Sequence, residues 1–283
     1  MRILLTGADG QLGTAIKSLC ASERVIVCDA TDLAQLDITN LQRVRRFVES
    51  CKPDFIVNCA AYNDVDAAED SNRFDDVCLV NSIGPRNLAI ASDEFKIPLM
   101  HFSTDYVFDG AKNTPYQITD LPHPINIYGG SKLLGESFVR SLTKMHFVVR
   151  LSWLFGPSGF NFVTKVSDWA KTSTEIRIVD DQTSCPCYTE DIAPAAIDLL
   201  ESKAYGLYHM TNSGWCSRFE WAKYIIECLD LGTNVVAAQS SDFNAAPRPG
   251  YSVLGQFPTF QTIGYELPDW RNATKRFLLS KDW

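Results

Sequence analysis

The sequence predicts an α/β protein, in which a doubly wound parallel sheet is followed by a smaller C-terminal α/β lobe. Short, continuously apolar runs alternate with segments of helical periodicity in the first half of the 283 residues, as expected for strands that are buried on both faces. This alternation loosens after about residue 156. Hydrophobic residues make up 46% of the chain and charged residues 21%, which is typical of a folded globular protein.

Five apolar runs are expected to form the strands of the main sheet. They lie at residues 2–6, 24–29, 54–61, 97–105 and 146–155. Helices are expected between the strands, starting near Gln11, at 40–51 and near Tyr128. The pattern is clear at 40–51, because its apolar residues recur at helical spacing. Strands that alternate with helices predict a parallel sheet with helices on both faces.

Two domains are expected, namely residues 1–155 around the main sheet and residues 156–283 as a smaller lobe. Within the lobe, short strands are expected at 175–182 and 205–211, with helices at 189–201 and 217–230. We expect the helix near 189–202 to pack back on the first domain. The stretch 245–268 is rich in Pro and Gly and is therefore expected to be mostly loop.

Charge and composition exclude several classes of function. The formal net charge is -8 and no run of five like charges occurs, so a nucleic-acid partner is not expected. No stretch approaches the roughly 18 apolar residues of a membrane span. The opening segment is too short for a signal peptide, so the nine cysteines are expected to be reduced thiols in the cytoplasm. Cys185 and Cys187 form the only close pair, with no further ligands at matching spacing, and no metal site is expected there.

Three glycines follow the first expected strand. Gly7, Gly10 and Gly13 lie between this strand and the helix that begins at Gln11. A dinucleotide pyrophosphate binds at such a turn, because glycines let its phosphates approach the backbone N–H groups and the helix N-terminus. A tight turn without a ligand would also use glycines. The position directly after an N-terminal strand favours a Rossmann-type dinucleotide site.

An acid ends the second expected strand. Asp29 lies 22 residues after Gly7, where a carboxylate can accept hydrogen bonds from the adenosine ribose 2′-hydroxyl. No Arg or Lys follows within "DATDLAQLD", so a clamp for a 2′-phosphate is missing. This favours NADH, although Asp29 could also do no more than end the strand.

A tyrosine and a lysine lie four residues apart in "INIYGGSK", at Tyr128 and Lys132. On a helix both side chains share one face, although the spacing also arises by chance. An ammonium beside a phenol favours the phenolate, so we expect Lys132 to lower the pKa of Tyr128. Such a tyrosine can donate a proton to a carbonyl oxygen as hydride arrives. Lys132 can also hydrogen-bond the nicotinamide ribose.

A hydroxyl is expected to hold the same carbonyl oxygen and to stabilise its developing charge. Ser103 and Thr104 both lie at the end of the fourth expected strand, at the edge of the sheet where ligands bind in such folds. Because side chains alternate along a strand, only one of the two hydroxyls can face the ligand. The residue pattern does not choose between them.

The chain resembles the extended short-chain dehydrogenases/reductases and, within them, the family of dTDP-4-dehydrorhamnose reductases. The glycine pattern and the Tyr–Lys pair match the superfamily. The narrower resemblance spans nearly the whole chain and rests on the stretches "TGADGQLG", "LDITN", "NCAAYNDVDAAE", "VNSIGPRNLA", "STDYVFDG", "PINIYGGSK", "LSWLFG", "DDQTSCP" and "YELPDW".

The resemblance implies reduction of the C4 ketone of dTDP-4-dehydro-β-L-rhamnose to dTDP-L-rhamnose, with NADPH or NADH as cofactor. Thr104 would be the hydroxyl member, Tyr128 the proton donor and Lys132 its partner. Contacts to the sugar nucleotide are implied for Thr104, Asp105, Tyr128, Trp153 and Arg248. Together with the patterns above, the residues expected at the cofactor are Gly7, Gly10, Gln11, Leu12, Gly13, Asp29, Asp37, Ile38, Ala60, Ala61, Tyr62, Asn81, Ser103, Tyr128 and Lys132.

Several of these residues have simpler interpretations that stay open. Trp153 and Tyr62 could be packing aromatics. Asp105 could cap a turn. Arg248 could be a solvated surface arginine, since its expected contact rests on the resemblance alone.

Some members of the family form homodimers bridged by Mg²⁺ through acids in the first helix and near a Glu-Asp pair. Glu190-Asp191 is present here, but "QLGTAIKSLC" contains no acid. A metal-bridged dimer is therefore not expected, while a homodimer and a contribution of Mg²⁺ stay open.

Three other functions stay open beside the leading one. The chain could be another nucleotide-sugar 4-ketoreductase or an epimerase, since these keep the glycines, the tyrosine and the lysine. It could also be a non-catalytic regulatory subunit of the methionine adenosyltransferase type. The complete set of Thr104, Tyr128 and Lys132 favours an enzyme.

Overall fold

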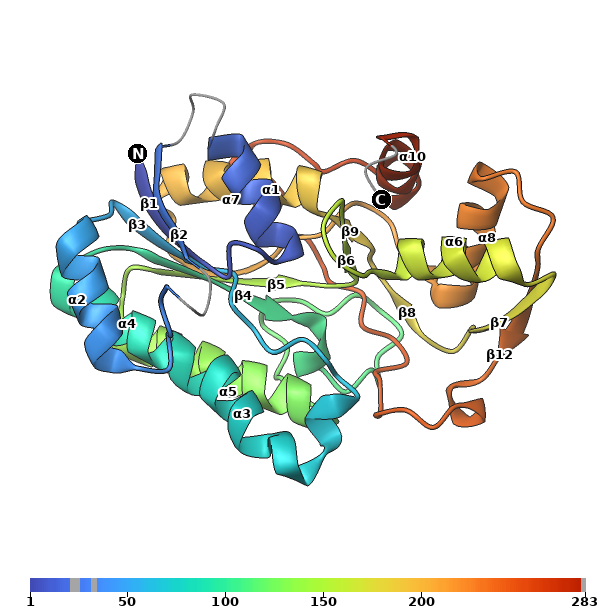
Figure 1. Ribbon diagram of the computed structural model, residues 1–283, viewed down its shortest axis with the longest axis horizontal. Coiled ribbons are helices and arrows are strands. Elements are labelled where there is room, and N and C mark those ends of the chain that lie inside the picture. The colour runs from blue at the N-terminus through green and yellow to red at the C-terminus, as the bar shows by residue number, and fades with distance from the viewer. Residues whose placement is uncertain (21–25, 32–34, 281–283) are drawn as a thin grey trace.

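The computed structural model describes residues 1–20, 26–31 and 35–280 (Figure 1). Its main sheet has six parallel strands in the order β10-β5-β4-β3-β1-β2, which confirms the doubly wound α/β fold. The order reverses between β1 and β3, and the carboxyl ends of these strands flank the crevice where ligands bind in such sheets. The strands are β1 (Arg2–Thr6), β2 (Ile26–Thr31), β3 (Phe55–Asn58), β4 (Leu99–Thr104), β5 (His146–Leu151) and β10 (Gly206–His209).

Helices cover both faces of the sheet (Figure 1). One face packs on α2, α4 and α5 through apolar side chains such as Val44, Leu88 and Val139. The other face packs on α1 and α7 through side chains such as Ile16 and Leu199. Neighbouring residues of a strand point to opposite faces, and this is why the strands are apolar throughout. The helices are α1 (Gln11–Cys20), α2 (Leu41–Cys51), α3 (Phe74–Cys78), α4 (Gly84–Phe95), α5 (Ile127–Leu142) and α7 (Thr189–Ser202).

Two strands end earlier than their apolar runs. β3 stops at Asn58, and the remainder of the expected strand 54–61 continues as a loop. The run 146–155 breaks at Trp153, whose φ of 38° is a left-handed conformation that a strand cannot continue. The short β6 (Leu154–Phe155) follows it. Both departures occur at the carboxyl edge of the sheet, where side chains turn toward the crevice.

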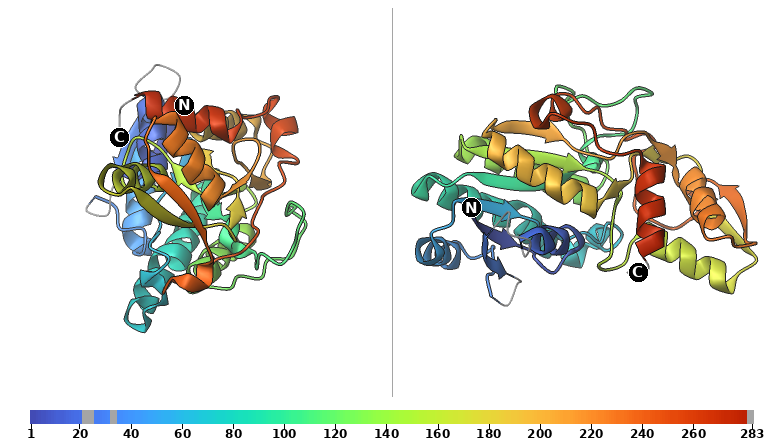
Figure 2. Two further views of the ribbon diagram at one scale, coloured as in Figure 1. Left: turned by 90° about the vertical axis from the view of Figure 1, so that its right-hand side faces the viewer. Right: turned by 90° about the horizontal axis from the view of Figure 1, so that it is seen from above.

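The C-terminal lobe has a core of its own, centred on Trp221 and Trp270, and Figure 2 shows it beside the sheet domain. It does not take up all of 156–283, because α7 packs on α1 and β10 pairs with β5 in the main sheet. The helices and strands of the remaining C-terminal part are α6 (Phe162–Thr172), β7 (Glu175–Val179), β8 (Thr183–Ser184), β9 (Cys187–Tyr188), β11 (Cys216–Ser217), α8 (Arg218–Cys228), β12 (Asn234–Ala238), α9 (Thr259–Ile263) and α10 (Trp270–Ser280).

Single-turn helices complete the described chain. They are η1 (Ala67–Glu69), η2 (Ser71–Arg73), the π-helical η3 (Leu79–Ile83), η4 (Asp105–Val107) and η5 (Ser240–Asp242). Within the described ranges, no helix combines the length and the apolar character needed to cross a membrane.

Candidate active site

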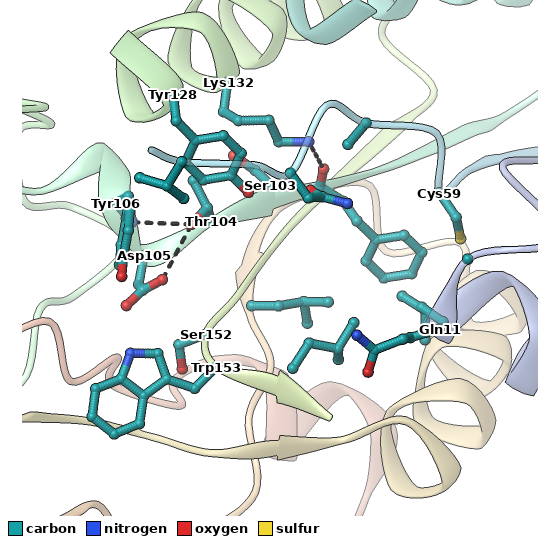
Figure 3. A pocket seen from close by; sticks show the side chains of 18 of the residues that line it. Gln11, Cys59, Ser103, Thr104, Asp105, Tyr106, Tyr128, Lys132, Ser152 and Trp153 are labelled. Atoms are coloured by element: carbon teal, nitrogen blue, oxygen red, sulfur yellow. Dashed lines mark hydrogen bonds between the residues drawn. The ribbon is translucent and has the colours of Figure 1, made fainter. Parts of the chain in front are cut away.

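A cleft of about 360 Å³ opens at the carboxyl ends of β1, β3, β4 and β5, within the usual size of small-molecule sites. Figure 3 shows Gln11 and Cys59 at one end, Asp105 and Trp153 at the other, and Tyr128 and Lys132 above. The lining residues are Gly10, Gln11, Leu12, Gly13, Cys59, Ala61, Asn63, Val65, Phe102, Ser103, Thr104, Asp105, Tyr106, Tyr128, Lys132, Leu151, Ser152, Trp153, Leu154, Phe160 and Arg218.

The glycine loop fits a dinucleotide. Gly7 has a φ of +67°, and a Cβ there would collide with the backbone of Ala60. A Cβ at Gly13 would collide with the Gly7 carbonyl, so packing alone requires these two glycines. Gly10 differs, because a Cβ there would meet only Gly7 O, at 3.4 Å. It lines the cleft, where a bare backbone leaves room for a pyrophosphate.

Two buried polar atoms on the cleft-lining side chains have no partner among the described residues. They are Gln11 Oε1, beside the glycine loop, and Ser103 Oγ, at the end of β4. An unpaired buried polar atom is destabilising, and a bound polar ligand would satisfy it. Both observations fit a cofactor held between the glycine loop and β4.

The tyrosine and the lysine lie on one face of α5, as predicted. The helix begins after Asn126, whose Oδ1 accepts a hydrogen bond from Gly129 N at 2.7 Å, as Asn does at a helix N-cap. Tyr128 is therefore in the first turn and Lys132 one turn later. Both line the cleft with Thr104 of β4, so the three predicted catalytic residues come together from two separate segments.

The electrostatics of the tyrosine differ from the expectation. Burial raises the pKa of Tyr128, against a smaller lowering effect of its hydrogen bond with Thr104. Lys132 is 3% exposed, and its ammonium donates to the Phe102 carbonyl at 2.7 Å rather than to the phenol. Burial also lowers the pKa of Lys132 to about 8. The predicted lowering of the Tyr128 pKa was wrong, because desolvation of the phenolate, together with the nearby Asp105 and Tyr106, raises this pKa.

Thr104 and Asp105 form a hydrogen-bonded unit. Thr104 Oγ1 accepts from Tyr106 N and donates to Asp105 Oδ1, both at 3.1 Å (Figure 3). The other Asp105 oxygen accepts from Ser184 Oγ at 3.1 Å and from Ser252 Oγ at 2.5 Å. Burial raises the pKa of Asp105 to about 6 although these hydrogen bonds lower it. It is Thr104, rather than Asp105, that caps the turn at η4.

Asp105 therefore joins β4 to two segments of the C-terminal half while its side chain lines the cleft. Of the two candidate hydroxyls, Thr104 is bonded to this network, whereas Ser103 Oγ is left without a protein partner. Both residues line the cleft, and the expectation that only one of the two hydroxyls faces the ligand stays a prediction. Their roles nevertheless differ, because only Thr104 is oriented by the protein.

Other predicted residues lie behind the cleft wall. Asn81 is fully buried and clamps the backbone of Tyr62, with its Oδ1 2.8 Å from Tyr62 N and its Nδ2 3.0 Å from Tyr62 O. Asp37 closes a turn by accepting from Thr39 N at 2.9 Å, and Ile38 is buried in the core. These contacts support the loops that line the cleft. The residues of the predicted cofactor set that do not line it are Gly7, Asp37, Ile38, Ala60, Tyr62 and Asn81.

Asp29 pairs with Leu4 through the backbone of β2, but its side chain lies outside the described residues. Its contact with the ribose therefore stays a prediction.

Arg248 does not line the cleft. Its guanidinium makes a two-pronged ion pair with Asp66, at 2.6 and 2.8 Å, and this pair lowers the Asp66 pKa to about 2. Trp153 does line the cleft, and its ring stacks on Trp221 at 5.8 Å between centroids. Trp153 is therefore both a packing aromatic and a wall of the cleft.

Sequence reasoning missed several lining residues. Cys59, Phe102 and Ser152 follow from the rule that ligands meet the carboxyl ends of parallel strands, and this signal was available. Tyr106 adjoins the predicted Asp105. Arg218, at the start of α8, has no local signal, because the fold of the second half brings it to the cleft.

Asp191 of the Glu190-Asp191 pair is bonded to other side chains within the described protein. Asp191 Oδ2 accepts from Asn212 Nδ2 at 2.7 Å and pairs with Arg276 at 2.5 Å. Among the residues that the structure describes, no three Cys, His, Asp or Glu side chains cluster as metal ligands would. α1 has no acid in its first turn.

The chain is similar to known proteins over nearly its whole length. A family model described as the RmlD substrate binding domain matches residues 1–282. The spore coat polysaccharide biosynthesis protein SpsK of Bacillus subtilis (strain 168) is 37% identical over 280 residues, covering 98% of this chain and 96% of the relative. A dTDP-4-dehydrorhamnose reductase of Mycolicibacterium smegmatis is 37% identical over 277 residues, covering 96% and 83%.

A solved structure matches closely as well. The crystal structure of dTDP-4-dehydrorhamnose reductase from Bacillus anthracis str. Ames, in complex with NADP, superposes with a TM-score of 0.94. The two chains are 38% identical, and the match covers 99% of each.

Proposed function

The chain belongs to the family of the RmlD substrate binding domain, and from this premise we propose that it is an NADPH- or NADH-dependent reductase. Its substrate is the 4-keto group of dTDP-4-dehydro-β-L-rhamnose, and its product is dTDP-L-rhamnose. The observation that carries the proposal is the convergence of Thr104, Tyr128 and Lys132 on one cleft, next to the glycine loop. Relatives that cover almost the whole chain bear the name of this reductase.

Tyr128 and Lys132 have different roles in the proton transfer. When bound, the reduced nicotinamide supplies a hydride to C4 of the sugar. Tyr128 donates its phenolic proton to the ketone oxygen, so that the ketone becomes an alcohol. The raised pKa of Tyr128 keeps this proton on the phenol at neutral pH, until the oxygen gains negative charge. Lys132 places a positive charge beside the phenolate that remains.

Thr104 orients the ketone. Its hydroxyl proton points to Asp105 Oδ1, and a rotation about the Cβ–Oγ1 bond would aim it at the ketone oxygen instead. A donor placed there stabilises the charge that develops on this oxygen. Asp105 is held by Ser184 and Ser252, so it can release Thr104 without losing all of its own partners.

One assay tests the proposed reaction. The purified protein is given dTDP-4-dehydrorhamnose with NADPH or NADH, the loss of the absorbance of the reduced coenzyme is followed, and the sugar product is identified. We expect one coenzyme oxidised for each dTDP-L-rhamnose formed. An epimerase would instead return the hydride to the sugar from a tightly bound, recycled coenzyme, and would not consume added NADPH or NADH. Unchanged substrate under these conditions would contradict the proposal.

The choice of coenzyme depends on Asp29. Its carboxylate is proposed to bind the ribose 2′-hydroxyl of NADH, and the stretch "DATDLAQLD" contains no Arg or Lys to favour a 2′-phosphate. Asp29→Ala should therefore weaken NADH more than NADPH, measured as the Kd of each. Equal weakening of the two would remove Asp29 from this role. We further propose that the protein acts in the cytoplasm, where both coenzymes and the sugar nucleotide are present.

A further inference from the structure

Arg218 is a cation in the cleft that the proposed reaction leaves without a role. It is the first residue of α8 and lines the cleft. The centre of its guanidinium lies 3.7 Å from the centroid of the Trp153 ring and 4.6 Å from that of Phe162. A guanidinium that lies over an aromatic ring is held by the ring face, while the N–H donors at its edge can still form hydrogen bonds.

No carboxylate of the described chain lies at ion-pair distance from Arg218. Asp105 is the nearest carboxylate that acts on its charge, but the oxygens of Asp105 accept hydrogen bonds from Thr104, Ser184 and Ser252. Arg218 nevertheless remains charged, since its pKa starts far above neutrality. Burial lowers that pKa, and the nearby Tyr106 and Asp105 offset the effect only in part.

A second arginine reaches the same place. The hydroxyl of Tyr106 interacts with the guanidinium groups of both Arg218 and Arg248. Arg248 has Asp66 as its counter-ion, whereas Arg218 forms no ion pair with a carboxylate of the described residues. Tyr106 also contacts Tyr128 edge to face, with 6.0 Å between ring centroids. The unpaired charge therefore lies one tyrosine away from the proton donor.

We propose that Arg218, held flat on Trp153, binds the diphosphate of the sugar nucleotide. This inference rests on the proposed function. In a hexopyranose, C4 and the anomeric carbon that carries the diphosphate lie on opposite sides of the ring. A substrate whose ketone meets Tyr128 therefore extends its diphosphate toward the far end of the cleft. A planar guanidinium with free edges suits two phosphate oxygens.

The competing interpretation is that Arg218 only packs between the aromatic rings of the C-terminal lobe. Binding experiments separate the two, because packing has no preference for phosphates. In the presence of NADPH, the Kd of dTDP is measured by calorimetry and that of thymidine by NMR titration. The variants are Arg218→Gln, which keeps the alkyl stem and the stacking amide, and Arg218→Lys, which keeps the charge.

A matched control is Arg271→Gln. Arg271 also stacks on a tryptophan, at 4.3 Å from the centroid of Trp270, but it is exposed and does not line the cleft. This variant should bind dTDP as the wild type does.

We expect Arg218→Gln to raise the Kd of dTDP by about 10- to 100-fold, the usual effect of losing hydrogen bonds to a charged group. The Kd values of thymidine and NADPH should stay unchanged, and Arg218→Lys should fall between Gln and wild type. The inference is overturned if dTDP binding is unaffected, if thymidine and dTDP weaken by the same factor, or if the wild type prefers neither ligand. Because binding needs no turnover, a wild type that binds dTDP through Arg218 but reduces no ketone would refute the proposed reaction alone.

Discussion

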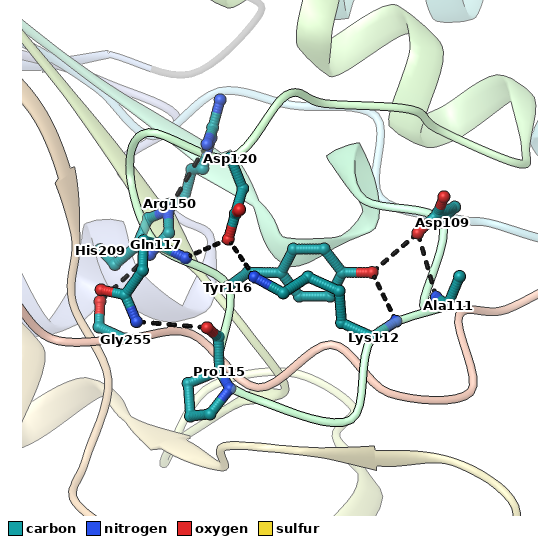
Figure 4. A network of polar contacts seen from close by, with 10 residues as sticks. All are labelled: Asp109, Ala111, Lys112, Pro115, Tyr116, Gln117, Asp120, Arg150, His209 and Gly255. Carbon is teal, nitrogen blue, oxygen red and sulfur yellow. Dashed lines mark hydrogen bonds and ion pairs between the residues drawn. The ribbon is translucent and has the colours of Figure 1, made fainter.

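Two arginines of this protein have lost most of their water, and they differ in what replaces it. Arg150 of β5 is fully buried, and its Nε and NH2 donate to the two carboxylate oxygens of Glu136 at 2.9 and 2.7 Å. His209 faces it from β10 at 3.4 Å. Figure 4 shows, near Arg150, a second set of paired polar groups that runs from Asp120 through Lys112 and Tyr116 to Asp109. Arg218 in the cleft has aromatic rings around it and no carboxylate at ion-pair distance among the described residues.

This difference distinguishes polar groups that stabilise the fold from polar groups that are available to a ligand. In the Arg150 region each charged group has an opposite charge or a hydrogen-bond partner, as in Lys112 with Asp120 at 2.6 Å (Figure 4). In the cleft, Ser103 and Gln11 each have a buried polar atom without a partner in the described protein, and Arg218 has no ion pair there. Substitutions in the first region should lower stability, and substitutions in the second should lower binding or turnover at nearly constant stability.

Tyr128→Phe should give the largest effect of the substitutions that test the difference between the cleft and the paired region. Removing the proton donor should lower turnover by about 10²–10⁴-fold, while the Kd of NADPH stays the same. Tyr116→Phe is the matched change in the paired region, where the hydroxyl donates to Asp109 Oδ1 at 2.7 Å. It should lower the free energy of unfolding by about 1 kcal/mol and leave turnover intact. Steady-state kinetics and denaturant unfolding measure both. Normal turnover in Tyr128→Phe would remove the phenol from the mechanism.

Glu136→Gln tests the paired region directly. It leaves the Arg150 guanidinium buried without a counter-charge, which should lower the free energy of unfolding by about 3–5 kcal/mol. The control is Ser137→Ala, an exposed neighbour on α5, which should change stability by less than about 0.5 kcal/mol. Urea unfolding at neutral pH gives both values. A loss below about 1 kcal/mol would show that the ion pair is not what stabilises this region.

The titration of Lys132 tests whether this lysine belongs with the paired region or with the unpaired groups of the cleft. Its pKa of about 8 in the folded protein lies below the ordinary 10.5, because burial disfavours the ammonium. Between these two pH values the unfolded chain holds more protons on this lysine than the folded one, so this group makes stability rise with pH from about 8 to 10.5. The rise amounts to at most about 3 kcal/mol.

Lys132→Met should abolish that rise. The measurement is the free energy of unfolding of both proteins between pH 7 and 10.5, and the difference between the two curves isolates the lysine from other titrating groups. Parallel curves would mean that the ammonium is well solvated or well paired, and that Lys132 belongs with the paired region.

Local spacing was enough to predict the parts of the site that one chain segment encodes. The glycines follow β1, and Tyr128 and Lys132 share a helix face whatever the remainder of the fold does. The same holds for the apolar strands, whose burial on both faces is written in their composition. Thr104 required the family resemblance, because strand alternation alone could not choose it over Ser103.

The remainder depends on contacts that no local pattern encodes. Asp66 and Arg248 are 182 residues apart in sequence, so the ion pair that occupies this arginine is invisible in either segment. Arg218 reaches the cleft only through the packing of the C-terminal lobe. The pKa of Tyr128 was predicted in the wrong direction because desolvation is a property of the assembled cleft and not of the Tyr–Lys spacing.

Ser103→Ala should give the smallest change in stability and yet decides whether an unpaired group in the cleft serves a ligand. Its hydroxyl has no partner in the described protein, so its removal should alter the free energy of unfolding by less than about 1 kcal/mol and in the stabilising direction, since an unsatisfied buried polar atom disappears. Ser184→Ala is the matched change at a paired hydroxyl, because Ser184 Oγ donates to Asp105 Oδ2 at 3.1 Å, and it should destabilise the protein by about 1–2 kcal/mol.

If Ser103 binds the coenzyme or the sugar, Ser103→Ala should raise the Kd of one of these ligands several-fold despite the gain in stability. A variant that is more stable and binds both ligands as the wild type does would show that an unpaired polar atom in this cleft is a packing defect, and the distinction between the two regions would then apply to charges and not to hydroxyls.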